Sequence, residues 1–405
     1  MSRLIYASSE QSADLWYVTG FNVPDPILWF QVGELSAIVV GSLELGRAQK
    51  QCKPGVTVID SAKLREFFHL PPEAEEEAQC RLLKKSLAAL RKLFHLNAKA
   101  EARAHWFVKQ VAVIARGTGE NTWEVPERFP LVFGDLLRKA GFTIKTQWNF
   151  CPERAVKSPE EIEKIRHSER LAEAGLAQAD GMLRDSVIES DGFLHLGGHI
   201  LTAEELRSAI DLEITRLGGL AQGTITAPGP QGADPHQHGE GPIRANEPIV
   251  MDIFPRDQAT GYFGDLTRTR VKGKASEAVR KAYETVLAAQ EKVLSHLKAG
   301  VQGKEMHNMV VEDFKAAGYE TGTDPATGVY HGFFHGLGHS VGLEIHESPS
   351  LSSGEERAMV AGNVVTDEPG LYYPEWGGIR IEDTVAVTET GVDNLAVAPK
   401  FLEID

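Results

Sequence analysis

The second half of the sequence repeats one order of predicted elements, and this repeat constrains the fold more than any other feature. Apolar residues at helical spacing predict four helices, and two strand-rich stretches follow the second and the fourth of them. The helices span about 159–184, 203–217 (behind a capping box, Thr202 to Glu205), 276–297 and 303–317, and the strand-rich stretches lie near 247–271 and 334–397. A helix pair followed by strands, present twice, predicts a duplicated unit of the α+β class.

A capping signal marks the start of this half. Ser158 suits an N-cap, Pro159 suits the first helical position, and Glu161 completes a capping box. A chain of 405 residues also exceeds what one hydrophobic core usually serves. We therefore expect two domains, 1–155 and 156–405.

The first 150 residues predict a mixture of strands and helices. Tyr17–Phe21 and Ser36–Val40 have strand character, and Glu73–His95 carries an apolar stripe at helical spacing. No cluster of catalytic residue types lies in this region. We expect a supporting or substrate-gating domain here.

Composition excludes several classes of function. Lys and Arg total 42 against 57 Asp and Glu, a formal charge of -15, which disfavours nucleic-acid and membrane partners. No apolar run approaches the roughly 20 residues of a membrane span, and Met1–Tyr17 lacks a signal-peptide pattern. Cys52, Cys80 and Cys151 are too few and too scattered for a disulfide framework. A cytoplasmic protein is expected.

Two aspartates border the turn of the first strand-rich stretch. Asp252 ends the apolar run Pro248-Ile-Val-Met, and Asp265 follows a turn-rich loop. We expect the two strands to form a hairpin in which Asp252 and Asp265 face each other. Opposed carboxylates repel unless a cation lies between them.

The second stretch combines imidazoles with further charged residues. Ten of the 14 histidines lie between His195 and His346, and His335, His339 and His346 fall within 12 residues. Glu368 precedes Pro-Gly-Leu-Tyr372, and strand alternation places Arg380 and Glu382 on one face of an apolar segment. Charges inside such strands need partners or a metal.

Together these residues offer the ligands of a metal centre: Asp252, Asp265, His339, Glu368 and Glu382. Four carboxylates and one imidazole suit two divalent cations. Two neighbouring cations lower the pKa of a shared water and polarise a carbonyl, which predicts a binuclear hydrolase.

These motifs resemble those of the pita-bread metallopeptidases, which include methionine aminopeptidase, aminopeptidase P, prolidase and creatinase. The resemblance is strongest to the proline-specific members and covers the whole chain, with 1–155 as the creatinase/prolidase-like N-terminal domain. Its motif evidence lies almost wholly in residues 236–385, where all five ligand types follow the family's order.

The resemblance implies a role for each matched residue. Asp252 binds one metal, His339 and Glu368 bind the other, and Asp265 and Glu382 bridge both. A metal-bridging hydroxide attacks the scissile carbonyl, and Glu368 also handles its proton. His346 stabilises the tetrahedral intermediate, and His236 lies near the substrate and leaving group. His335 lines the proline-side pocket, Arg380 supports the site or a substrate carboxylate, and Tyr372 matches an active-site tyrosine.

The sequence departs from the family pattern at two places. Asp265 lies 13 positions after Asp252, which is longer than the family's usual spacing, and we interpret the excess as a longer hairpin tip at 256–260. Asp257 would be an alternative ligand, but it would lie in the turn. An apparent insertion, Asp191–Ile200, carries His195 and His199, which we interpret as solvated loop residues.

The resemblance implies hydrolysis of Xaa-Pro bonds, by an Xaa-Pro dipeptidase (prolidase) or by an aminopeptidase P that acts on longer Xaa-Pro-led peptides. A creatinase-like amidinohydrolase and a non-enzymatic binding module remain as alternatives, although both usually lose ligands. Manganese is the expected metal, with cobalt, zinc and iron as alternatives. A homodimer or higher homo-oligomer is expected.

Overall fold

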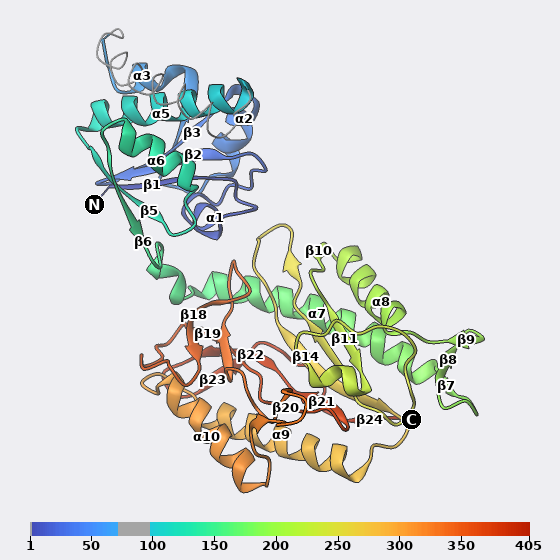
Figure 1. Cartoon of the computed structure of the whole chain (residues 1–405). Helices are drawn as coiled ribbons and strands as arrows, with labels where there is room; N and C mark the ends of the chain where they lie inside the picture. The colour runs from blue at the N-terminus through green and yellow to red at the C-terminus, as the bar shows by residue number, and fades with distance from the viewer. Residues whose placement is uncertain (1, 72–97) are drawn as a thin grey trace. The chain divides into compact units, whose positions relative to one another are not determined.

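The computed structural model describes residues 2–71 and 98–405. The chain divides into two compact units, Met1–Pro152 and Glu153–Asp405, each with its own apolar cores (Figure 1). The division lies close to the boundary expected at 155. The helix predicted over Glu73–His95 lies outside the described residues.

A mixed six-stranded sheet forms the centre of the first unit, in the order β4-β3-β2-β1-β5-β6. Strands β1, β2 and β3 pair antiparallel, whereas β3–β4, β1–β5 and β5–β6 pair parallel. The strands are β1 (Arg3–Ala7), β2 (Ile27–Val32), β3 (Leu35–Val40), β4 (Val56–Asp60), β5 (Thr122–Pro126) and β6 (Thr143–Gln147). The helices are α1 (Ala13–Thr19), α2 (Ser42–Gln51), α3 (Leu64–Phe67), α5 (Ala98–Thr118) and α6 (Leu131–Lys139).

The strand predicted over Tyr17–Phe21 is wrong, because most of this segment belongs to helix α1. Ser12 caps that helix by accepting a hydrogen bond from Leu15 N, and Gly20 ends it with a φ of 64°. The aromatic and β-branched residues favour a strand locally, but the two caps and the burial of Leu15 outweigh that preference. The strand predicted over Ser36–Val40 is present as β3.

The second unit contains the predicted helix pairs, each followed by strands. The helices are α7 (Pro159–Asp185), α8 (Ala203–Arg216), α9 (Glu277–His296) and α10 (Gly303–Ala316). The strands are β7 (Val187–Ile188), β8 (Leu194–Leu196), β9 (His199–Ile200), β10 (Gly219–Leu220), β11 (Ile225–Pro228), β12 (Ile249–Ile253), β13 (Arg256–Asp257), β14 (Leu266–Lys272), β15 (Gly322–Thr323), β16 (Tyr330–His331), β17 (Gly338–Ser340), β18 (Glu347–Leu351), β19 (Val364–Asp367), β20 (Gly370–Tyr373), β21 (Gly377–Arg380), β22 (Asp383–Val387), β23 (Val392–Asn394) and β24 (Glu403–Ile404).

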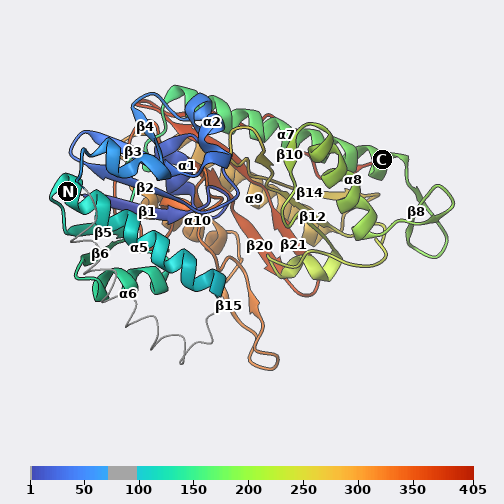
Figure 2. The same cartoon turned by 90° about the horizontal axis from the view of Figure 1, so that it is seen from above.

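Each helix pair packs on its own set of strands. Helices α7 and α8 lie side by side in both views, and their apolar faces share a core with β12 and β14 (Figures 1 and 2). Helices α9 and α10 share a second core with β19, β21 and β22. The larger sheets have the orders β11-β12-β14-β24 and β18-β17-β19-β22-β23. This duplicated arrangement confirms the predicted α+β class.

Both predicted capping boxes are present. Ser158 N donates to Glu161 Oε2 at 2.9 Å while Glu161 N donates to Ser158 Oγ at 3.3 Å, and Thr202 and Glu205 repeat the pattern. In the described part of the chain, no helix is long and apolar enough to cross a membrane.

Candidate metal centre

The five predicted ligands lie within or next to strands of the second unit. Asp252 lies in β12, and Asp265 directly precedes β14. His339 lies in β17, Glu368 directly follows β19, and Glu382 connects β21 to β22. Both halves of the duplicated unit therefore contribute ligands to one place.

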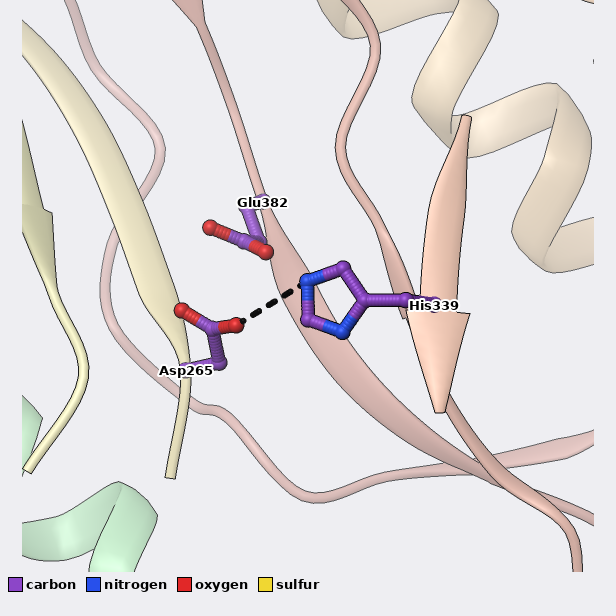
Figure 3. A group of neighbouring side chains, drawn as sticks. All are labelled: Asp265, His339 and Glu382. Carbon is purple, nitrogen blue, oxygen red and sulfur yellow. Dashed lines mark ion pairs between the residues drawn. The ribbon is translucent and has the colours of Figure 1, made fainter. Parts of the chain in front are cut away.

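Three of these residues form the centre of the cluster. One ligand atom from each of Asp265, His339 and Glu382 lies within 4.8 Å of the others (Figure 3). His339 Nε2 lies 3.4 Å from Asp265 Oδ2, the contact that is dashed in Figure 3, and 3.5 Å from Glu368 Oε1. Glu368 therefore adjoins the same imidazole.

Asp252 approaches the cluster from the neighbouring strand and is held by Arg380. Arg380 Nη2 donates to Asp252 Oδ2 at 2.6 Å. The expected direct pairing of Asp252 with Asp265 is wrong, since Asp252 lies opposite Thr267 in the β12–β14 register. Leu266, the first residue of β14, lies opposite Ile253, so Asp265 falls just outside the paired residues of the two strands.

Burial and mutual repulsion perturb the acids. Burial raises the pKa of Asp265 and of Glu368 well above the usual range, and the nearby carboxylates raise both further. Burial, with the charge of Asp252, raises the pKa of Glu382 to about 8. Burial lowers the pKa of His339 to about 4, so its imidazole is neutral at pH 7. Neutral imidazole is the form that binds metal.

The arrangement fits a metal centre. Asp252 Oδ1 is buried and has no hydrogen-bond partner among the residues that the structure describes, an arrangement that a cation would satisfy. Carboxylates that repel one another beside a neutral imidazole are the ligands that divalent cations take. Asp252, Asp265, His339, Glu368 and Glu382 would hold such ions.

Two histidines lie beside the cluster. The His346 ring is 4.3 Å from the His339 ring, centroid to centroid, at 72°. Burial lowers the pKa of His346, and the charge of His236 lowers it further. The side chain of His236 is exposed.

A hydrogen-bonded chain connects Asp252 with the other predicted substrate residues. Arg380 Nη1 donates to Tyr372 Oη at 2.9 Å, and Tyr372 Oη lies 2.9 Å from His335 Nε2. His335 Nδ1 faces the carbonyl of Gly336 at 2.7 Å, so this nitrogen is the donor and Nε2 accepts from Tyr372. Burial lowers the pKa of His335 to about 3, which keeps the ring neutral. Arg380 thus contacts Asp252 and Tyr372 directly.

Two residues near the cluster were missed in the sequence. Thr267 donates to Glu382 Oε2 at 2.6 Å, and Glu169 on α7 accepts from Asp265 N at 2.7 Å. Side chains two positions apart on a strand point to the same face, so the spacing of Asp265 and Thr267 could have indicated that Thr267 lies near the cluster. Glu169 interrupts the apolar stripe of α7, four residues after Ile165, which was another.

Three residues that were weighed as alternative ligands lie elsewhere. Asp257 accepts from Thr260 N and Oγ1 in the turn after β13, which pairs with β10. His195 pairs with Asp191, and His199 pairs with Glu205, in the small β7–β8–β9 sheet. These partners favour Asp252 over Asp257 as the acid that accompanies Asp265 in the cluster.

The duplicated fold and its buried cluster of acids and imidazole define a metal-dependent hydrolase of the pita-bread class. The model of metallopeptidase family M24 matches residues 163–389, more than half of the chain. The chain belongs to metallopeptidase family M24, and the resemblance inferred from its motifs is confirmed.

Some curated relatives are named for an activity, and others are uncharacterised peptidases. The chain is 37% identical over 180 residues to an Xaa-Pro dipeptidase of Pyrococcus furiosus, which covers 44% of this chain and 48% of that protein. It is 33% identical over 285 residues to an uncharacterised peptidase of Staphylococcus haemolyticus, covering 68% and 76%. An uncharacterised peptidase of Bacillus subtilis matches at 30% over 62% of this chain and 65% of its own length. The chain thus spans about half to two thirds of the Pyrococcus and Bacillus relatives.

Solved structures extend the likeness in fold to the whole chain. An Xaa-Pro dipeptidase from Bacillus anthracis superposes with a TM-score of 0.77 at 20% identity, covering 100% of this chain and 95% of that one. An X-Pro aminopeptidase from Thermotoga maritima gives 0.74 at 22% identity, covering 100% and 97%. At this level of identity the comparison shows the fold.

Proposed function

We propose that this protein is a metal-dependent exopeptidase that hydrolyses Xaa-Pro bonds, with Xaa-Pro dipeptides as its substrates. The observation that carries the proposal is the buried group of Asp265, His339 and Glu382, with Glu368 3.5 Å from the same imidazole. The relatives named Xaa-Pro dipeptidase support the choice of substrate. The tertiary amide before proline has no N–H to donate to an enzyme, which is a chemical reason for a peptidase dedicated to this bond.

Each site residue has a proposed task. Asp252, Asp265, His339, Glu368 and Glu382 would hold two divalent ions, with manganese favoured by the carboxylate-rich set. Such ions lower the pKa of a bound water and polarise a peptide carbonyl. Glu368 accepts the proton of the attacking water, and His346 donates a hydrogen bond to the oxygen of the tetrahedral intermediate.

The leaving side of the substrate has its own residues. His236 lies near the leaving group, and His335 lines the proline-side pocket, with the fully buried Tyr372 hydrogen-bonded to its ring. We assign Arg380 to support of the site, since its guanidinium contacts Asp252, Thr267 and Tyr372. A cytoplasmic location and a homo-oligomer complete the proposal; sedimentation of the purified protein measures the second.

The experiment measures the hydrolysis of three peptides. The protein is first stripped of metal with a chelator and then loaded with manganese. Ala-Pro tests the dipeptidase activity, Ala-Pro-Ala tests the aminopeptidase P alternative, and Ala-Ala is the matched control without proline. Hydrolysis of Ala-Pro well above that of the other two supports the proposal. Faster cleavage of Ala-Pro-Ala favours the aminopeptidase alternative, and absence of activity on both proline peptides contradicts the proposal. Elemental analysis gives the number of bound ions.

A further inference from the structure

A buried group of charges lies beside the candidate metal centre but outside its ligand set. Lys157 Nζ lies 3.0 Å from Glu347 Oε2, and Arg154 Nη2 lies 2.5 Å from Glu347 Oε1. The side chains of Lys157 and Glu347 are 2% and 5% exposed. Glu347 directly follows His346, so these two cations reach the loop that carries the proposed catalytic histidine.

The loop between His339 and His346 is folded around the Glu347 carboxylate. Glu344 N donates to Glu347 Oε1 at 3.1 Å, and a Cβ at Gly342 would lie 2.6 Å from both oxygens of that carboxylate. Only glycine leaves room for the carboxylate at this position. The position of Glu347 and the path of the loop are therefore coupled.

Further hydrogen bonds fix the segment that carries these two cations. Lys157 N donates to Gly362 O at 2.7 Å, and Lys157 Nζ also donates to Ser340 Oγ at 2.9 Å. Asn363 Nδ2 donates to Ala155 O at 2.7 Å. The segment before α7 is thus tied to the end of β17, where the loop begins, and to the two residues that precede β19.

Glu344 supplies a second carboxylate, whose Oε2 lies 2.9 Å from Arg154 Nη2, so two cations face two acids. Burial by itself would raise the pKa of Glu347, but Lys157 and Arg154 lower it below its usual value, so the carboxylate is ionised at pH 7. An ionised carboxylate in this position is costly unless its cations stay in place.

We propose that Lys157 and Arg154 are positioning residues that hold the loop 341–346 through Glu347 and thereby set His346 relative to His339. The inference rests on the proposed peptidase function for its kinetic consequence, because His346 acts there on the intermediate. Its structural consequence, an ordered loop, is independent of which substrate is cleaved.

The test replaces Lys157 by a side chain of similar length without charge, Lys157→Met. In the manganese-loaded variant we expect kcat to fall by about 10- to 100-fold, since a displaced catalytic group costs that order of rate. KM is expected to stay within about twofold and the metal content to equal that of the wild type. Hydrogen–deuterium exchange of the peptide covering 341–346 is expected to accelerate.

A matched control removes another cation of the same unit. Arg166 on α7 lies 2.6 Å from Asp393 and does not contact the loop, so Arg166→Met is expected to leave kcat and loop exchange unchanged. If Lys157→Met fails to fold, Lys157→Met/Glu347→Gln removes both charges and leaves no unpaired lysine or carboxylate. That double variant is expected to show the same fast loop exchange and reduced kcat.

The outcomes separate this inference from the proposed function. Unchanged loop exchange in both Lys157 variants overturns the positioning role, as does fast exchange with an unchanged kcat in an active enzyme. A wild type that cleaves no Xaa-Pro peptide contradicts the proposed function alone, and loop exchange then decides the inference. A variant with a lower Tm and unchanged exchange would also overturn it, because that result marks a merely structural residue.

Discussion

At the scale of single residues, Asp265 lies where four other acids converge. Glu382, Asp252, Glu368 and Glu169 all act to raise its pKa, after burial itself. Its carboxylate also faces His339 Nε2 at 3.4 Å. A cation shared with the neighbouring carboxylates would offset their mutual repulsion.

We predict that Asp265→Ala abolishes metal binding at both proposed sites, because the resemblance implies that Asp265 bridges the two ions. Elemental analysis after manganese loading and calorimetric titration measure the effect. Asp393→Asn is the control, because its half-exposed carboxylate lies away from the cluster and pairs with Arg166. Retention of one full equivalent of metal in the Asp265 variant would contradict the bridging role.

His346 gives a prediction of the opposite kind. His346→Ala is expected to keep the wild-type metal content, because His346 is outside the ligand set, and to lose about 10²- to 10³-fold in kcat. His195→Ala is the control, since that histidine pairs with Asp191 in the small β7–β8–β9 sheet. A kcat like that of the wild type in the His346 variant would remove this residue from the proposed mechanism.

At the scale of elements, an acid on the last strand connects β24 to the start of α9. Glu403 accepts from Arg280 Nη2 at 2.8 Å, from Lys274 Nζ at 3.1 Å and from Ala275 N at 3.0 Å. These hydrogen bonds, with that from Arg280 first, lower the pKa of Glu403 from 4.5 to about 2. The carboxylate is therefore favoured in the folded protein.

The sign of the pH effect follows from this lowered pKa. The stabilisation from Glu403 is complete above about pH 4.5 and disappears as the pH falls through about 2. Glu403→Gln is expected to lower Tm at pH 7, with a difference from the wild type that shrinks between these two pH values. Thermal unfolding followed over pH 2–7 measures it, and Glu356→Gln is the control with a single lysine partner. A constant difference at every pH would contradict the assignment.

At the scale of the whole molecule, all five proposed ligands lie in one of the two units, Glu153–Asp405. A ligand that binds only the folded form stabilises it, by about 2.7 kcal/mol when its concentration is 100 times Kd. Removal of metal by a chelator is therefore expected to lower the unfolding temperature of the second unit and leave that of Met1–Pro152 unchanged. Calorimetry with and without chelator measures both transitions, and equal shifts in the two would contradict the placement of the ions.

Helices α7 and α1 show which parts of the fold could be predicted from the sequence. Helix α7 was predictable because its capping box needs only Ser158 and Glu161, three residues apart. Helix α1 was not, since Tyr17 and Val18 favour a strand and only their caps and the burial of Leu15 oppose that preference. Elements with strong local signals were predicted, and those decided by packing were not.

For the candidate site, the sequence by itself determined the ligand types and their order, because acids and an imidazole within or next to predicted strands are visible in it. The tertiary structure decided which of them meet. It placed Thr267 opposite Asp252, joined Arg380 to Asp252 across 128 positions and brought Lys157 to Glu347 across 190. Contacts over such separations depend on how two sheets and their helices pack, and a local pattern carries no record of that packing.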